Sequence, residues 1–170
     1  EPGEEETPTP DPEEDETPTP PHEVLIPVSR GSSLPTWALL GDPVGGVAIL
    51  DSGFGPRRLS SQEDRDDFHR GVDLDAALGT PVFAIADGRV ARLHPEDGSD
   101  GNTLYVEHSL PLPVPFHDEQ IDRFYAVYSH LDTFTVEEED AVGAGQQLGT
   151  VGQTGGAVGP HLHFEIRLGT

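Results

Sequence analysis

A β-strand that carries two histidines is encoded near the end of the sequence, by Gly159-Pro160-His161-Leu162-His163-Phe164-Glu165-Ile166-Arg167. Successive side chains of a strand point to opposite faces, so Leu162, Phe164 and Ile166 share one face, which is expected to pack in a core. The two histidines share the other face, with Cα atoms about 6.6 Å apart. At that separation one imidazole can bind a metal while the other serves the group that the metal activates.

A second motif, Phe68-His69-Arg70-Gly71-Val72-Asp73, supplies further candidate metal ligands. Zinc binds imidazole nitrogen and carboxylate oxygen, and a catalytic zinc usually has three protein ligands and one water. His69, Asp73 and one of the paired histidines would make that number. A fully extended chain would hold His69 and Asp73 about 13 Å apart, so it must bend between them, and Gly71 permits the bend.

A third motif, Tyr125-Ala126-Val127-Tyr128-Ser129-His130-Leu131, places His130 at the end of an expected strand, where it can face the same cleft. Glu165 shares a strand face with the paired histidines and could orient an imidazole, but a solvated carboxylate is the more common outcome at such a position. The other histidines are interpreted as structural or solvated: His22, His94, His108 and His117.

These motifs resemble the catalytic domain of the lysostaphin/LytM-type zinc metallopeptidases, peptidase family M23, which hydrolyse peptide bonds in peptidoglycan. Order and spacing agree from about residue 47 to residue 167, in the stretches 51–57, 68–73, 79–90, 128–131, 151–155 and 159–164. The resemblance implies that His69, Asp73 and His163 bind one Zn²⁺ per chain. It also implies that His130 and His161 are the catalytic histidines.

The chain departs from the family pattern in two places. Ala157-Val158 stands where the family commonly has Ser/Thr-Thr. A long insert, residues 109–123, contains Leu110-Pro111-Leu112-Pro113-Val114-Pro115 and is expected to form a loop at the rim of the cleft. Substrate preference therefore does not transfer from any relative.

The expected reaction follows from the residue types. A zinc with three protein ligands lowers the pKa of its bound water to about 7 and polarises a carbonyl oxygen. The sequence has no His-Glu-x-x-His motif, so one of His130 and His161 is the expected general base. The other is the expected donor to the oxyanion or the leaving amine, and the sequence leaves open which takes which role. The predicted function is zinc-dependent hydrolysis of peptide bonds in peptidoglycan stems or cross-bridges, by zinc-bound water assisted by two histidines.

Composition divides the chain into three parts. Residues 1–22 consist mainly of Glu, Asp, Thr and Pro and are expected to be a disordered acidic linker, because they cannot bury enough apolar surface to offset their ordering entropy. Residues 23–46 are expected to form an ordered strap or lead-in, and residues 47–170 the metallopeptidase domain. Short strands cut by Gly, Pro and Asp predict an all-β, antiparallel, sandwich-like fold of the LytM type. The expected strands are 47–50, 81–86, 89–93, 103–108, 124–130, 147–151 and 161–167.

The formal net charge of −23 excludes a general nucleic-acid binder, which needs a basic patch to neutralise phosphates. The absence of cysteine excludes disulfides and thiolate metal sites. No stretch is long and apolar enough to predict a membrane span. The expected partners are peptidoglycan peptides, which lie outside the cytoplasmic membrane. The expected location is therefore extracytoplasmic, whether secreted, periplasmic or tethered to the envelope, and a monomer is favoured.

Two other function classes remain open. A catalytically silent regulator of cell-wall amidases can be built on the same domain, but such relatives typically lack zinc ligands and this chain has every motif position. A carrier or binding module is suggested by Gly79-Thr80-Pro81-Val82 and Asp87-Gly88-Arg89-Val90, which also resemble sugar-phosphotransferase carrier domains. That alternative would not require Asp73. A zinc assay separates the three, because only the peptidase needs a tightly bound zinc together with hydrolysis.

Overall fold

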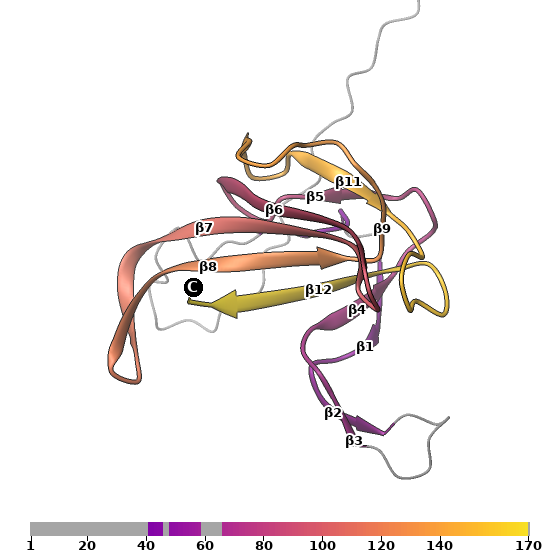
Figure 1. Ribbon diagram of the computed structural model, residues 1–170, viewed down its shortest axis with the longest axis horizontal. Helices are drawn as coiled ribbons and strands as arrows, with labels where there is room; N and C mark the ends of the chain where they lie inside the picture. The colour runs from indigo at the N-terminus through magenta and orange to yellow at the C-terminus, as the bar shows by residue number, and fades with distance from the viewer. Residues whose placement is uncertain (1–40, 46–47, 59–65, 170) are drawn as a thin grey trace, which may run out of the picture.

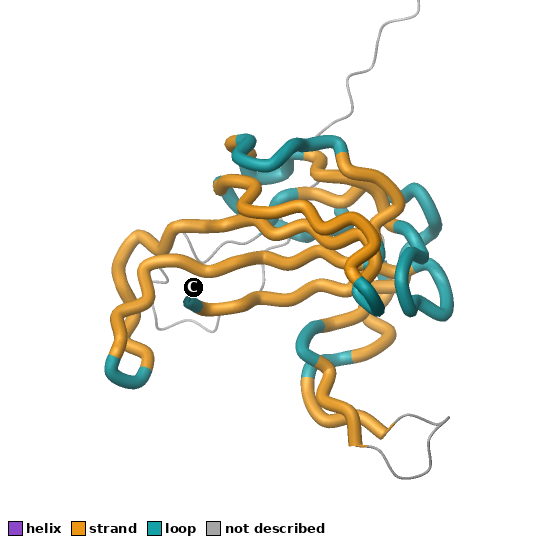
Figure 2. Tube along the Cα trace, viewed as in Figure 1, coloured by secondary structure: helices purple, strands orange, loops and turns teal. Residues whose placement is uncertain are grey.

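The computed structural model describes residues 41–45, 48–58 and 66–169. This part of the chain forms antiparallel strands and contains no helix (Figure 1, Figure 2), which confirms the all-β prediction. The expected linker 1–22 and the expected lead-in as far as residue 40 lie outside the described residues. The strands are β1 Ile49–Ser52, β2 Gly55–Arg58, β3 Asp66–His69, β4 Val72–Asp75, β5 Pro81–Phe83, β6 Gly88–Asp97, β7 Gly101–Phe116, β8 Glu119–Ser129, β9 Leu131–Phe134, β10 Ala141–Val142, β11 Gln147–Val151 and β12 His161–Leu168.

A large and a small sheet enclose the core. The large sheet has the strand order β1-β4-β12-β8-β7-β6-β10, the small one β5-β11-β9, and β2 and β3 form a separate hairpin. In Figure 1 the small sheet lies at the top and the β2–β3 hairpin at the lower right. The buried cluster draws on both sheets, and among its members are Val82, Val90, Leu104, Val106, Ala126, Tyr128, Leu148, Val151 and Leu162. The Tyr128 hydroxyl accepts a hydrogen bond from the Ile85 N–H at 3.3 Å, so its polar end is satisfied.

The apolar face of β12 is buried only at its beginning. Leu162 is fully buried in the core and Phe164 packs against it. Ile166, which the sequence placed on the same buried face, is 43% exposed. The prediction of one continuous buried face is therefore wrong for the C-terminal end of β12, because Ile166 and Leu168 lie outside the buried cluster that the two sheets enclose.

The prediction of a loop at residues 109–123 is also wrong. This segment is the outer part of a long β7–β8 hairpin (Figure 1, left), in which Val114 pairs with Ile121 and His117 turns the chain with a φ of 53°. Alternating prolines suggested a loop. Beyond Glu107, however, β7 pairs with β8 alone among the described strands, and a free strand edge tolerates residues without an N–H. The insert therefore extends the sheet.

His108 is a buried histidine in the core. Its side chain stacks on Phe124 with ring centroids 4.8 Å apart, and Nδ1 donates to the carbonyl oxygen of Asp87 at 2.9 Å. Nε2 has no hydrogen-bond partner among the described residues. Burial lowers the pKa of His108, against the opposing effect of the Asp87 carbonyl. The folded protein therefore resists protonation of this imidazole.

We expect the protein to lose stability as the pH falls below about 6.5, the ordinary histidine pKa. The unfolded chain then takes up a proton that folded His108 resists. The stabilisation that neutral His108 provides is fully present above pH 6.5. As the pH falls from 6.5 to the lower pKa of folded His108, the free energy of unfolding decreases by about 1.4 kcal/mol per pH unit. Between pH 7.5 and pH 5.5, the melting temperature of chelator-treated His108→Leu should thus fall by less than that of chelator-treated wild type. His117→Leu, at the hairpin tip, is the matched control, and equal losses in wild type and His108→Leu would refute the interpretation.

Candidate metal centre

The strands β3, β4 and β12 bring His69, Asp73 and His163 together. β4 and β12 place Asp73 directly opposite His163 in antiparallel register. His69 is the last residue of β3, and the chain turns at residues 70 and 71 before β4 begins. A Cβ atom at Gly71 would lie 2.3 Å from the carbonyl oxygen of Phe164. Gly71 is therefore needed because the turn presses directly against β12, and it does not adopt a left-handed φ.

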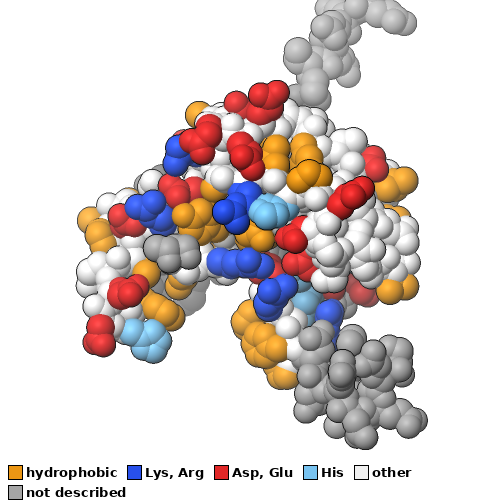
Figure 3. All heavy atoms as spheres, in the orientation of Figure 1, with side chains coloured by type: hydrophobic (Ala, Val, Ile, Leu, Met, Phe, Trp, Pro, Cys, Tyr) orange, Lys and Arg blue, Asp and Glu red, His pale blue; other side chains and the backbone are white. Residues whose placement is uncertain are grey.

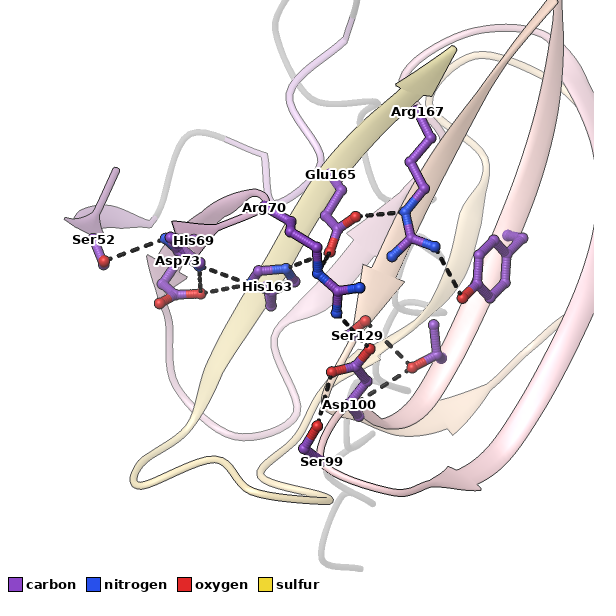
Figure 4. A network of polar contacts seen from close by, with 12 residues as sticks. Ser52, His69, Arg70, Asp73, Ser99, Asp100, Ser129, His163, Glu165 and Arg167 are labelled. Atoms are coloured by element: carbon purple, nitrogen blue, oxygen red, sulfur yellow. Dashed lines mark hydrogen bonds and ion pairs between the residues drawn. The ribbon is translucent and has the colours of Figure 1, made fainter. Parts of the chain in front are cut away.

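Three electron-pair donors converge at this point (Figure 4). Nε2 of His69 lies 3.1 Å from Oδ1 of Asp73 and 3.0 Å from Nδ1 of His163, and the last two atoms are 2.8 Å apart. The remaining ring nitrogens fix the tautomers of the neutral imidazoles. Nδ1 of His69 donates to the carbonyl oxygen of Gly53 at 2.8 Å, and Nε2 of His163 donates to the carboxylate of Glu165 at 3.0 Å. Both imidazoles thus direct a lone pair toward Asp73.

This donor set fits a cation. Acceptor atoms repel one another unless a proton or a metal ion lies among them, and a tetrahedral zinc would hold its donors about 3.3 Å apart, close to the observed spacing. Without an ion a proton takes that role. Burial alone would lower the pKa of His163, but hydrogen bonds to Asp73 and Glu165 outweigh it and raise the pKa to about 9. At Asp73 burial alone would raise the pKa, but the hydrogen bond from His163 and the charges of the neighbouring histidines together outweigh it and lower the pKa. His69, Asp73 and His163 can therefore hold a metal ion.

His130 and His161 lie beside this group. Their ring centroids are 4.7 Å apart, and Nε2 of His161 lies 3.7 Å from Oδ1 of Asp73. Nδ1 of His130 donates to the carbonyl oxygen of Thr154 at 3.0 Å, and Nδ1 of His161 donates to that of Gly159 at 2.9 Å. In the neutral rings Nε2 therefore carries the lone pair. The five residues that the sequence analysis singled out are thus neighbours in one site.

The backbone at His130 has a rare conformation. His130 separates β8 from β9 and has a φ of 63°, in the left-handed region that costs a non-glycine residue roughly 1–2 kcal/mol. Its N–H donates to the carbonyl oxygen of Asp100 at 3.0 Å, which helps to hold this corner. Burial, reinforced by the neighbouring His161, lowers the pKa of His130. The imidazole is thus held in place, and its surroundings favour the neutral form.

Glu165 is a site residue that the sequence analysis undervalued. It is 3% exposed, so the expectation of a solvated carboxylate is wrong. One oxygen accepts from His163, and the other accepts from Nε of Arg167 at 2.6 Å. Arg70 adds an ion pair at 3.7 Å. The available signal was the alternation of histidine, glutamate and arginine on one strand face, which places a carboxylate between an imidazole and a guanidinium.

Residues 51–57 supply contacts for which the sequence analysis gave no role. Arg57 donates to Oδ2 of Asp73 at 3.4 Å, and the Ser52 hydroxyl lies 3.3 Å from Nδ1 of His69. Ser52 pairs with Asp73 between β1 and β4, and this pairing brings the segment 51–57 next to the metal centre. Each of the three converging side chains is therefore held from behind by another polar group.

The site lies in a cleft of about 1020 Å³. The large sheet forms its floor, Phe68 lies on one rim, and the loop with Ala157 and Val158 on another. Val158 is 97% exposed. Phe68 packs edge-on against Phe54 with ring centroids 5.2 Å apart. The lining of the cleft thus combines the apolar side chains of Phe68, Ala157 and Val158 with the polar residues of the metal centre.

Comparisons with known proteins agree with this geometry. The chain is 35% identical over 117 residues to the peptidoglycan DD-endopeptidase ShyC of Vibrio cholerae, covering 69% of this chain and 24% of ShyC. A crystal structure of a zinc-containing peptidase from Vibrio cholerae superposes with a TM-score of 0.61 at 32% identity, covering 74% of this chain and 35% of that one. The catalytic domain of lysostaphin from Staphylococcus simulans gives a TM-score of 0.58 at 28% identity, covering 72% of this chain and 82% of that one.

The family assignment rests on the matched residues. The chain spans only about a quarter of the length of ShyC. Among the described residues, no helix has the length and apolar character needed to cross a membrane. The model of peptidase family M23 matches residues 67–170, a segment that includes His69, Asp73, His130, His161 and His163. The chain belongs to peptidase family M23.

Proposed function

We propose that this chain is a zinc-dependent endopeptidase that hydrolyses peptide bonds in peptidoglycan stems or cross-bridges. The observation that carries the proposal is the convergence of three acceptor atoms with two further imidazoles beside them. A silent regulator of amidases has no need of that arrangement. The peptidoglycan substrate is inferred from relatives such as ShyC, and from that substrate we propose a location outside the cytoplasmic membrane. A monomer is the oligomeric state that we propose.

The roles of the metal-binding residues follow from their atoms. His69 would bind one Zn²⁺ through Nε2, Asp73 through Oδ1 and His163 through Nδ1, with Gly53, Arg57 and Glu165 fixing their orientations. Zinc, when bound there, supplies Lewis-acid polarisation of a peptide carbonyl and acidifies water. The carboxylate of Asp73 and two neutral imidazoles leave a net positive charge at the ion.

His130 and His161 share the proton transfers. Each has a lone pair on Nε2 because its Nδ1–H is donated to a backbone carbonyl. A neutral imidazole in this state accepts the proton of the attacking water, and an imidazolium donates a hydrogen bond to the oxyanion or a proton to the leaving amine. The backbone carbonyls hold both rings in place, so neither ring has to reorganise during the reaction.

The proposed function is tested by digestion of purified sacculi. Zinc-loaded protein should release products that mass spectrometry identifies as cleaved at a peptide bond, with the glycan strands intact. Removal of the metal by a chelator should stop the reaction, and added zinc should restore it. Intact sacculi and intact cross-linked muropeptides after incubation with the zinc-loaded protein would overturn the proposal and favour a regulator.

The carboxylate of Glu165 should strengthen zinc binding through His163. Glu165→Gln keeps the shape of the side chain but removes the charge that accepts from Nε2 of His163. Loss of such a partner typically weakens metal affinity by about 10- to 100-fold, which competition with a chelator of known affinity measures. Glu107→Gln is the matched control, since Glu107 accepts from Tyr125 and Arg123 on the same sheet and touches no histidine. Unchanged affinity in Glu165→Gln would show that the carboxylate only braces Arg167.

A further inference from the structure

A second cavity opens beside the proposed zinc site. It has a volume of about 530 Å³, and its polar lining consists of Arg92, Tyr105, Tyr125 and Arg167. Arg167 donates a hydrogen bond to Glu165, and Glu165 accepts another from His163. The cavity is therefore connected to a proposed zinc ligand through two side chains.

The strand register places this cavity on the same sheet face as the metal centre. Tyr105 pairs with Arg92 on one side and with Val127 on the other, and Val127 pairs with Glu165. The strand rise of about 3.3 Å and the strand spacing of about 4.8 Å put the cavity on the order of 10–15 Å from the proposed zinc site. Three or four residues of extended peptide span that distance.

The cavity is positively charged in a strongly acidic protein. The chain has a net charge of −23 and no lysine. Four of the six arginines with described side chains line this cavity or the zinc cleft, namely Arg57, Arg70, Arg92 and Arg167. Figure 3 shows blue arginine and pale-blue histidine side chains gathered in the middle of this face, in the hollow between its two projecting parts. Aspartates outnumber the arginines in the zinc cleft, whereas none of the described residues that line the second cavity carries a carboxylate.

Several hydrogen-bond donors in this cavity have no acceptor among the residues that the structure describes. Arg92 makes no hydrogen bond or ion pair within the described part of the chain. Arg167 donates Nε to Glu165 and Nη1 to the Tyr105 hydroxyl, which leaves Nη2 without an acceptor among the described residues. Tyr105 accepts from Arg167 and therefore keeps its own O–H to donate. The Arg167 guanidinium also lies over the Tyr105 ring, 5.5 Å from its centroid, which fixes its plane.

We propose that this cavity is a carboxylate-binding subsite, in which Arg92 and Arg167 hold an acidic group of the peptide three or four residues from the scissile bond. The proposal rests on the proposed function, since it takes the ligand to be a substrate of the neighbouring site. A planar guanidinium fork matches a carboxylate in shape, and a tyrosine hydroxyl can add a third hydrogen bond. The acidic surface of the protein repels extended polyanions, whereas one carboxylate meets only the local positive charge.

The subsite is tested with a cross-linked muropeptide in its free-acid form and in its fully amidated form. Wild type should hydrolyse the free acid with a kcat/KM about tenfold higher, the lower end of what charge-assisted hydrogen bonds provide, because Arg92 is exposed to solvent. Arg92→Gln should bring the ratio close to one. Arg89→Gln should leave the ratio unchanged, because Arg89 lies on the same strand but pairs with Glu139 outside both cavities. The wild-type ratio should also shrink as salt is added.

Binding separates a failure of the subsite from a failure of the proposed function. Titration calorimetry with the zinc-loaded His130→Ala variant, with and without Arg92→Gln, measures the affinity for both muropeptides. Tighter binding of the free acid that depends on Arg92, together with zinc-loaded wild type that cuts neither form, would keep the subsite and overturn the peptidase proposal. Hydrolysis of both forms at equal rates, unaffected by Arg92→Gln, would overturn the subsite and leave the peptidase proposal intact.

Discussion

Replacing His163 by alanine is expected to remove bound zinc and to abolish hydrolysis. Two remaining protein ligands rarely hold a catalytic ion against buffer, because metal affinity depends on the full donor set. The same result is expected for His69→Ala and Asp73→Ala, since the atoms of all three residues meet at 2.8 to 3.1 Å. Elemental analysis after dialysis measures the zinc content, and the muropeptide assay measures the loss of activity.

His94→Ala is the matched control for these three variants. His94 is a half-exposed histidine whose ion-pair partner, Asp97, lies on the same strand β6, and it lines neither the zinc cleft nor the arginine cavity. It should keep its zinc and its activity. Full zinc content in dialysed His163→Ala would show that the ion lies elsewhere and would refute the assignment of ligands.

Replacing His130 or His161 by alanine should separate activity from metal content. Neither imidazole belongs to the converging group, so both variants should retain zinc. Each should lose on the order of 10²–10⁴-fold in kcat/KM, the usual range for a positioned acid or base. Circular dichroism should report an intact fold, because both side chains line the cleft and contribute nothing to the apolar core.

The outcome that would contradict these roles is specific. If His161→Ala lost zinc while His163→Ala kept it, the two histidines of β12 would have to exchange roles. The geometry argues against the exchange, because Nδ1 of His163 lies 2.8 Å from Asp73 while the nearest nitrogen of His161 is 3.7 Å away.

The fold class and most strands of the core could be predicted from the sequence, because alternating apolar residues mark a half-buried strand. β11 has the predicted bounds, 147–151. β3, Asp66–His69, was missed because it carries no alternating apolar pattern, and β9 was missed because it follows β8 after a single residue. The extent of β7 was underestimated because the prolines of the insert indicated a break. That inference fails at a free strand edge, where the missing N–H is not needed.

The five candidate site residues were brought together as the sequence motifs indicated. The groups that hold them could not be predicted in the same way. Gly53 and Thr154 act through backbone carbonyls, which leave no trace in residue type. Glu165 was undervalued because strand carboxylates are usually solvated. The neighbouring Arg167 was visible in the strand alternation, whereas the ion pair with Arg70 arises only in the folded structure.

Anomalous diffraction from a crystal of the zinc-loaded protein, recorded at the zinc absorption edge, tests the central claim most directly. We predict one zinc per chain, bound by Nε2 of His69, an oxygen of Asp73 and Nδ1 of His163, with distances of about 2.0–2.2 Å. His130 and His161 should stand beside the ion without binding it. A zinc bound by either of these two imidazoles, or no anomalous peak at this position after zinc loading, would contradict the account.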